Sequence, residues 1–236
     1  MRRIIVALLL CFLLSGCSFI NLDFSNKDDM IADINAISSD IMKANIKIKV
    51  TFVNSYDIVS GYKQGSGFIY ETSGNSYKAV SNAHVFTNED WKVKKIEIFD
   101  YTTENSYIGK LINIDVNKDM ATLSFKGNND YPLKAISFAE KLPEKNDIVY
   151  AIGAPLGQVN NLTIGRYLGL TSNIPNNNFG FELIYSTAPI DHGNSGGMLL
   201  NEDLMVIGMN TAELESDNGV YCGSIPFNEL ISFIGN

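Results

Sequence analysis

The feature that most constrains the fold is a long succession of short segments in which apolar and polar residues alternate. Such alternation is typical of strands that bury one face, and turn-forming residues separate the segments. Two groups are apparent, one on each side of residue 135. The first group covers residues 46–53, 65–71, 76–82, 94–101, 107–116 and 120–125, and the second covers 148–154, 162–170, 180–188, 197–200, 205–212 and 219–225. The pattern predicts an all-β fold of two packed six-stranded antiparallel barrels, residues 45–135 and 136–236.

Two short helices are expected to flank the strands. Met30, Ile34, Ile37 and Ile41 recur at spacings of 4, 3 and 4, which is typical of an amphipathic helix over residues 29–44. Its polar face is acidic, which favours packing against the domain over lying on a membrane. The tail, residues 226–235, is expected to form the C-terminal helix.

The N-terminus has the pattern of a bacterial export signal. Two arginines precede a short apolar run over residues 4–14, and "LSGC" follows, ending at Cys17. This motif resembles the lipobox of bacterial lipoproteins. The resemblance implies a signal peptide over residues 1–16, a lipidated Cys17 followed by a polar tether, and attachment to a membrane of the bacterial cell envelope. An uncleaved anchor or an ordinary signal peptide is the alternative.

The cysteine content and the net charge argue against an internal disulfide and against a nucleic acid partner. Cys11 would leave with the signal peptide and Cys17 would carry lipid, so Cys222 is left and no internal disulfide is expected. Cys222 lies in an alternating run and is expected to be a buried apolar side chain. The net charge of −8 repels phosphate backbones, which disfavours nucleic acid as a partner.

Ser195, in "DHGNSGGMLL", is either a nucleophile or a serine in a glycine-rich turn. A serine hydroxyl needs a base, and the base needs an orienting group. Of the two histidines, His192 lies three residues before Ser195 and is interpreted as a loop residue, because side chains so close in a tight turn rarely face each other. His84, at the end of a predicted strand, is either the base or a structural histidine. Asp119 directly precedes an apolar strand and is the preferred orienting acid, whereas Asp115 is expected to serve the turn.

The glycines around Ser195 suit a second role. A tetrahedral intermediate is stabilised by backbone N–H groups aimed at its oxyanion. Gly193 can adopt backbone angles that turn such groups inward. We therefore expect an oxyanion hole formed by the N–H groups of Gly193 and Ser195, with Asn194 as a further candidate.

Five motifs carry a resemblance to the chymotrypsin-type fold, and more closely to its bacterial HtrA/Deg branch. They occur in order over residues 46–232, and they are "GSGFIYETSGNSYKAVSNAHVF", "DMATLSF", "AIGAPLG", "APIDHGNSGGMLLNEDLMVIGMNTA" and "GSIPFNEL". The resemblance implies a serine endopeptidase with polypeptide substrates, an acyl-enzyme intermediate and no metal or cofactor. His84, Asp119 and Ser195 would be its catalytic triad.

The sequence also departs from this branch. It ends at Asn236, so we expect no PDZ domain, and His192 stands where the family often has proline. No basic cleavage site precedes an Ile-Val-Gly-Gly-like segment, so trypsin-style activation is not expected. A lipid anchor is unusual for the branch.

Specificity is expected to depend on residues before Ser195 and on the strand over 208–214. Apolar Pro189 and Ile190 favour small or medium aliphatic side chains in the primary pocket, while Glu213 at the rim leaves a basic preference open. The candidate substrate-binding residues are Pro189, Ile190, Asn210, Thr211, Glu213 and Leu214. A glutamyl-endopeptidase-like specificity and a catalytically silent binding module are the rival functions. The natural substrate and the oligomeric state stay open.

Overall fold

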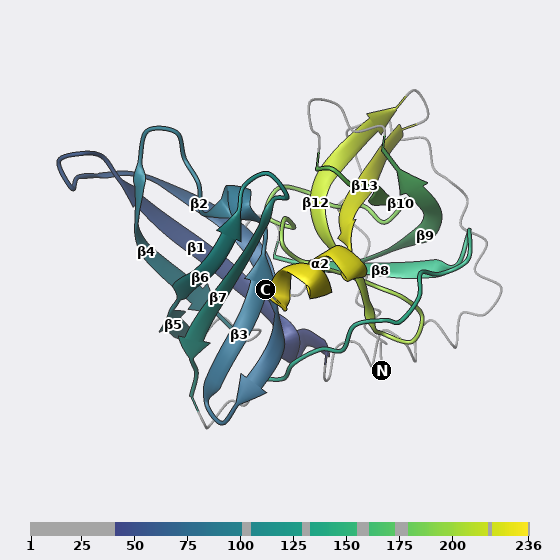
Figure 1. Cartoon of the computed structure of the whole chain (residues 1–236), viewed down its shortest axis with the longest axis horizontal. Helices are drawn as coiled ribbons and strands as arrows, with labels where there is room; N and C mark the ends of the chain where they lie inside the picture. The colour runs from purple at the N-terminus through teal and green to yellow at the C-terminus, as the bar shows by residue number, and fades with distance from the viewer. Residues whose placement is uncertain are drawn as a thin grey trace, which may run out of the picture.

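The computed structural model describes residues 41–100, 105–128, 133–154, 161–172, 179–216 and 219–235. Two β-structured halves lie side by side, with a short C-terminal helix between them (Figure 1). The predicted fold class is confirmed. The predicted leader, Cys17, the tether and most of the helix expected over residues 29–44 lie outside the described residues. The last four residues of that helix, Ile41–Ala44, form the 3-10 helix η1.

The first half is one antiparallel sheet. Its strand order is β5-β4-β1-β2-β3-β7-β6. The strands are β1 (Asn45–Val53), β2 (Val59–Ser73), β3 (Ser76–Ser81), β4 (Lys92–Phe99), β5 (Ser106–Ile108), β6 (Lys110–Asp115) and β7 (Met120–Lys126).

The single strand expected over residues 107–116 is divided at Gly109. Its first part, β5, pairs with β4, and its second part, β6, pairs with β7 at the other edge of the sheet. The Gly109 N–H donates to the Ile96 carbonyl oxygen over 2.9 Å. A Cβ atom at Gly109 would lie 2.8 Å from the side chains of Ile96 and Ile98. Six expected strands thus become seven, and Gly109 connects the two strands, β5 and β6, that lie at opposite edges of the sheet.

The second half is a closed antiparallel barrel of strand order β10-β13-β12-β11-β8-β9. Its strands are β8 (Ile148–Gly153), β9 (Asn161–Thr171), β10 (Leu183–Ser186), β11 (Met198–Leu200), β12 (Val206–Ser216) and β13 (Gly219–Pro226). These positions agree with the six segments expected from the alternating pattern.

Hydrophobic burial explains both the strands and their association. In β1, Ile46, Ile48 and Val50 are fully buried, while the lysines between them are partly exposed. One cluster of buried residues contains Phe68 from the first half together with Tyr150 and Met198 from the second. The two halves therefore share a core, and burial of apolar area holds them together.

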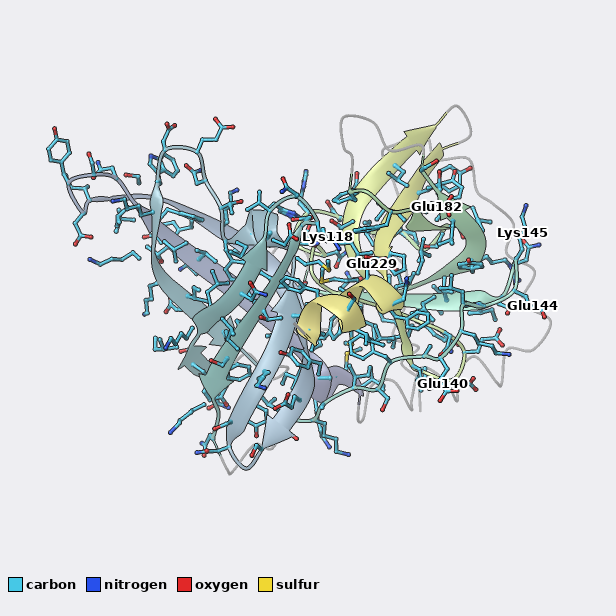
Figure 2. All side chains as sticks on the ribbon, in the orientation of Figure 1. Lys118, Glu140, Glu144, Lys145, Glu182 and Glu229 are labelled. Atoms are coloured by element: carbon cyan, nitrogen blue, oxygen red, sulfur yellow. The ribbon has the colours of Figure 1, made fainter. Side chains whose placement is uncertain are left out.

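The C-terminal helix α2 (Phe227–Ile234) buries Leu230 and Phe233 in this shared core. Glu229 on the same helix lies 3.6 Å from the Lys118 ammonium group, which belongs to the turn before β7 (Figure 2). The predicted C-terminal helix is thus present and contacts both halves. Within the described residues, no helix has the length and apolar character that crossing a bilayer requires.

The segment that connects the halves is hydrogen-bonded to both of them. The Ile136 N–H donates to the Ile69 carbonyl oxygen in the first half over 2.9 Å. The Ala139 N–H donates to the Val206 carbonyl oxygen in the second half, and the Val206 N–H donates to the Ser137 carbonyl oxygen, both over 2.9 Å. This connector is therefore part of the folded structure on both sides.

Candidate active site

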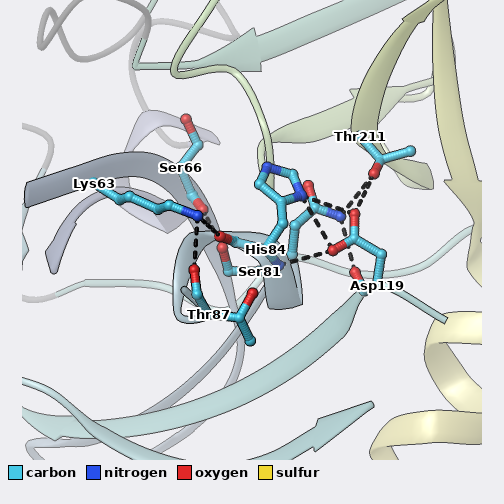
Figure 3. A network of polar contacts seen from close by, with 8 residues as sticks. Lys63, Ser66, Ser81, His84, Thr87, Asp119 and Thr211 are labelled. Atoms are coloured by element: carbon cyan, nitrogen blue, oxygen red, sulfur yellow. Dashed lines mark hydrogen bonds and ion pairs between the residues drawn. The ribbon is translucent and has the colours of Figure 1, made fainter. Parts of the chain in front are cut away.

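His84 lies in the 3-10 helix η2 (Ala83–Val85), directly after β3. Its neighbours Ala83 and Val85 are each 1% exposed, whereas the His84 side chain is 46% exposed. Burial of the two apolar neighbours turns the imidazole outward. The Lys63 ammonium group stabilises this turn, because it donates to the carbonyl oxygens of His84 and Thr87 over 3.0 and 2.7 Å (Figure 3).

Asp119 lies in the turn between β6 and β7, with a φ of +54°. Its carboxylate is close to His84, with Oδ2 2.9 Å and Oδ1 3.1 Å from Nδ1, and Oδ1 also accepts the His84 backbone N–H over 2.9 Å. Asp115 serves the same turn differently, since its Oδ1 accepts the backbone N–H groups of Asn117 and Lys118. Of the two candidate acids, Asp119 is the one that meets the imidazole.

Two further side chains complete the surroundings of Asp119. The Thr211 hydroxyl, from β12, donates to Asp119 Oδ2 over 2.6 Å. The Asn82 amide group donates to the Asp119 carbonyl oxygen and to Thr211 Oγ1, each over 3.0 Å (Figure 3). The Asp119 carboxylate therefore belongs to a buried polar network and contacts the more exposed imidazole of His84.

Ser195 occupies the turn before β11 and lies beside the His84 segment. A Cβ atom at Gly65 would meet both Val85 Cγ2, at 2.6 Å, and the Ser195 carbonyl oxygen, at 3.2 Å. The Gly196 N–H donates to the Asn210 carbonyl oxygen over 2.8 Å, next to Thr211. Although both residues are described, Ser195 Oγ and His84 Nε2 form no hydrogen bond. Such bonds are often long in free enzymes and shorten when substrate binds.

The backbone around Ser195 presents two N–H groups without acceptors. Gly193 has a φ of +102°, a conformation that favours glycine. In the described part of the chain, the N–H groups of Gly193 and Ser195 donate to no acceptor. The Asn194 N–H differs, because it donates to the Asp191 carbonyl oxygen over 2.9 Å. Of the three expected donors, the structure leaves two open.

The model of the "Trypsin-like peptidase domain" family matches residues 65–209, which include His84, Asp119 and Ser195. The chain belongs to this family.

Within the trypsin-like peptidases, this chain is similar to HtrA-type serine proteases. It is 33% identical to "Serine protease HTRA1" of Xenopus tropicalis over 179 residues, which are 72% of this chain and 35% of the relative. It is 36% identical to the "Probable periplasmic serine endoprotease DegP-like" of Rickettsia conorii over 152 residues, 63% of this chain and 28% of the relative. The chain thus spans about a third of the length of these relatives.

A solved structure of the HtrA-type protease AlgW with tripeptide superimposes with a TM-score of 0.70. The two chains are 24% identical, and the match covers 86% of this chain and 62% of the AlgW chain. At this identity the likeness supports the fold. The alternating segments predicted its two β-structured halves, and the resemblance of the motifs implied their chymotrypsin-like arrangement.

The residues expected to contact substrate are placed very differently in this trypsin-like peptidase. Pro189 and Glu213 are exposed, Ile190 is half-buried, and Leu214 is 5% exposed. The remaining two residues, Thr211 and Asn210, form buried hydrogen bonds. Thr211 is bonded to Asp119, and Asn210 is fully buried, where its amide group donates to the Met198 carbonyl oxygen over 3.0 Å. His192 is exposed at the edge of the same turn.

Cys222 is fully buried in β13 and has polar neighbours. Its Sγ lies 3.3 Å from Ser224 Oγ and 3.5 Å from Asn210 Oδ1. Burial raises the pKa of the Cys222 thiol to about 11, against the lowering effect of its hydrogen bonds with Ser224 and Ser186. The side chain is therefore a neutral thiol at physiological pH.

Sequence reasoning did not assign roles to Lys63, Ser66 and Asn82, or the supporting role to Thr211. Asn82 and Ser66 lie within the quoted motif that ends in "SNAHVF", so their positions were visible but their partners were not. The two contacts of Asn82, for example, join residues 37 and 129 positions apart, so no local periodicity in the sequence indicates them.

Proposed function

We propose that this chain is a serine endopeptidase in which Ser195 is the nucleophile, His84 the general base and Asp119 the orienting acid. The observation that carries the proposal is the double contact of the Asp119 carboxylate, which meets both His84 Nδ1 and the His84 backbone N–H. In this proposal the proton of the neutral imidazole is on Nδ1, where it is donated to the carboxylate. The other ring nitrogen, Nε2, is then free to accept a proton.

The reaction proceeds through proton transfers at His84. As Ser195 Oγ attacks a peptide carbonyl carbon, His84 Nε2 takes the hydroxyl proton, and the buried Asp119 carboxylate stabilises the imidazolium. His84 then gives this proton to the leaving amine, which leaves an acyl group on Ser195. Water, activated by the same imidazole, attacks the ester and regenerates the serine.

The negative oxygen of the tetrahedral intermediate is placed against the N–H groups of Gly193 and Ser195. Both groups lack acceptors in the described structure, so no hydrogen bond has to break for them to receive an oxyanion. Asn194 is not a donor in this proposal, because its N–H is bonded to Asp191.

The substrates are polypeptides, with small or medium aliphatic side chains before the scissile bond. Half-buried Ile190 is the apolar wall in this proposal, while exposed Glu213 lies at the rim. A peptide library cleaved by the purified protein is the test. Cleavage dominated by Lys, Arg or Glu before the scissile bond would refute the aliphatic preference.

The location we propose is the bacterial cell envelope, with a lipid anchor at Cys17. The Rickettsia conorii relative is described as periplasmic, which supports the location, while the "LSGC" motif supports the anchor. Replacing Cys17 by alanine should move the protein from the membrane fraction to the soluble fraction. Retention of Cys17→Ala in membranes, or failure of a labelled fatty acid to mark the unaltered chain, would contradict the anchor.

Labelling with a fluorophosphonate tests the proposed activity. The probe reacts with activated serines, so the unaltered chain should be labelled and Ser195→Ala should not. Ser60→Ala is the matched control, because Ser60 lies on the same β2 strand as Gly65 but its hydroxyl is bonded to the Ile58 carbonyl oxygen away from the site. Equal labelling of the unaltered chain and Ser195→Ala would exclude Ser195 as the nucleophile.

A further inference from the structure

Ser66, the middle residue of the "GSG" stretch on β2, is the part of the quoted motifs to which the proposed mechanism gives no role. It is fully buried, and both its backbone and its hydroxyl are bonded. Its backbone N–H donates to the Ser195 carbonyl oxygen over 2.8 Å. Its carbonyl oxygen accepts the Ser81 hydroxyl over 2.6 Å (Figure 3).

The hydroxyl of Ser66 bridges the two halves of the molecule. The Ala154 N–H, at the end of β8, donates to Ser66 Oγ over 2.8 Å. The hydroxyl in turn donates to the Gly193 carbonyl oxygen over 2.6 Å. Because the Ala154 N–H occupies a lone pair of the oxygen, the hydroxyl proton is directed to Gly193, and the direction of this short chain of bonds is fixed.

Ser66 is hydrogen-bonded to Gly193 and Ser195, the two residues whose N–H groups are the proposed oxyanion donors. Ser66 holds Gly193 and Ser195 through their carbonyl oxygens, and the N–H groups of the same two residues are open. The Gly193 carbonyl belongs to the peptide plane that follows a backbone φ of +102°. The N–H of the same plane, from Asn194, donates to the Asp191 carbonyl oxygen over 2.9 Å, so the Ser66 hydroxyl adds a second hydrogen bond to this plane.

Close packing leaves the hydroxyl little freedom. A Cβ atom at Gly153 would lie 3.0 Å from Ser66 Oγ, and one at Gly196 would lie 2.2 Å from the Ser66 carbonyl oxygen. The glycines therefore let two backbone segments approach the serine from both sides.

We propose that Ser66 is a positioning residue for the oxyanion hole: its hydroxyl and its N–H together hold the Gly193–Ser195 backbone in the conformation that leaves both N–H groups open. Ser66 does not contact substrate in this proposal. The predicted effect on catalysis rests on the proposed endopeptidase function, but the predicted effect on the loop does not.

The experiment compares the full chain with Ser66→Ala and Ser81→Ala. Ser81→Ala is the matched control, since it also removes a fully buried hydroxyl at this junction, but one whose hydrogen bond goes to the Ser66 carbonyl oxygen and not to residues 193–195. Hydrogen–deuterium exchange of peptides covering residues 190–198 reports on the loop, and peptide hydrolysis as a function of pH reports on catalysis. If Ser66→Ala does not fold, Ser66→Cys replaces it, because a thiol fills the site with a weaker donor.

We expect Ser66→Ala to speed exchange in residues 190–198 by about fivefold or more, with Ser81→Ala close to the unaltered chain. We also expect kcat to fall about 10- to 100-fold with little change in KM, somewhat less than the loss of an oxyanion donor itself. The acid limb of the pH profile, which reports on His84, should not move.

Three results would overturn the proposal. They are unchanged exchange in Ser66→Ala, an equal loss in Ser81→Ala, and a fall in kcat that comes with a shifted acid limb, since the last would place the effect on His84. Faster exchange in Ser66→Ala, combined with no hydrolysis and no fluorophosphonate labelling of the unaltered chain, would support Ser66 holding the loop and refute the endopeptidase function.

Discussion

At the scale of single residues, the backbone of Asp119 decides how its role is best tested. Its φ of +54° lies in the left-handed region, where aspartate and asparagine are tolerated but most side chains are strained. Replacement by alanine would therefore disturb the turn as well as the carboxylate. Asparagine keeps the shape and the conformation and removes the charge.

Asp119→Asn should lower kcat by about 10⁴-fold while leaving the protein folded. The amide group would favour the wrong tautomer of His84, because it can donate to Nδ1 where the carboxylate accepts. Hydrolysis of a peptide ester, with thermal unfolding as the folding control, is the measurement. Asp115→Asn is the comparison, and an equal fall there would mean that the turn and not the carboxylate is responsible.

Cys222 gives a prediction for alkaline pH. Burial raises the pKa of its thiol from 9.0 to about 11 in the folded protein. The folded state therefore holds this proton more tightly than the unfolded state does. The resulting stability is complete below about pH 9 and is lost as the pH rises towards 11.

Urea unfolding at pH 8, 9, 10 and 11 checks this linkage. The unfolding midpoint of Cys222→Ala should fall less steeply above pH 9 than that of the parent, because the titrating group is gone. Identical pH dependence of the two proteins would show that the thiol does not contribute.

At the scale of elements, the helix α2 offers two neighbouring apolar residues with opposite surroundings. Leu230 is fully buried in the shared core, and Ile231 is 47% exposed. Leu230→Ala should cost about 2–5 kcal/mol of unfolding free energy, since it leaves a cavity, and Ile231→Ala should cost well under 1 kcal/mol. Urea unfolding of both variants is the measurement, and similar costs would mean that α2 does not pack as described.

The positions of the strands were largely predictable from the sequence, but the contacts between residues of different strands were not. Alternation located β1, β7 and β13 within a residue or two, because a half-buried strand imposes its period on every side chain. The division of one expected strand at Gly109 was not visible, since a glycine in an alternating run breaks no pattern. The contacts of Ser66 with Gly193 and of Thr211 with Asp119 join separate halves, and only the folded chain brings them together.

At the scale of the whole molecule, the shared core predicts a single unfolding transition. Phe68 from the first half packs in one cluster with Tyr150 and Met198 from the second, so neither half keeps a complete core without the other.

The single tryptophan and the one cysteine found within the described residues allow this to be tested. Trp91 belongs to the first half, just before β4, and Cys222 to the second. In urea, the change in Trp91 fluorescence and the exposure of the Cys222 thiol should share one midpoint, in a Cys11→Ser, Cys17→Ser background. Separate midpoints would show that the halves unfold independently.

The connector has a consequence for how the two halves can move. Where two lobes are joined by a free linker, they can swing apart about a hinge and close again on a ligand. Here the backbone of Ile136 is hydrogen-bonded to the first half and that of Ala139 to the second. The Thr211–Asp119 and Ser66–Ser195 hydrogen bonds also join the two halves directly. A hinge motion that separated the two halves would break the hydrogen bonds between them and expose the shared core. The two halves are therefore expected to move as one body.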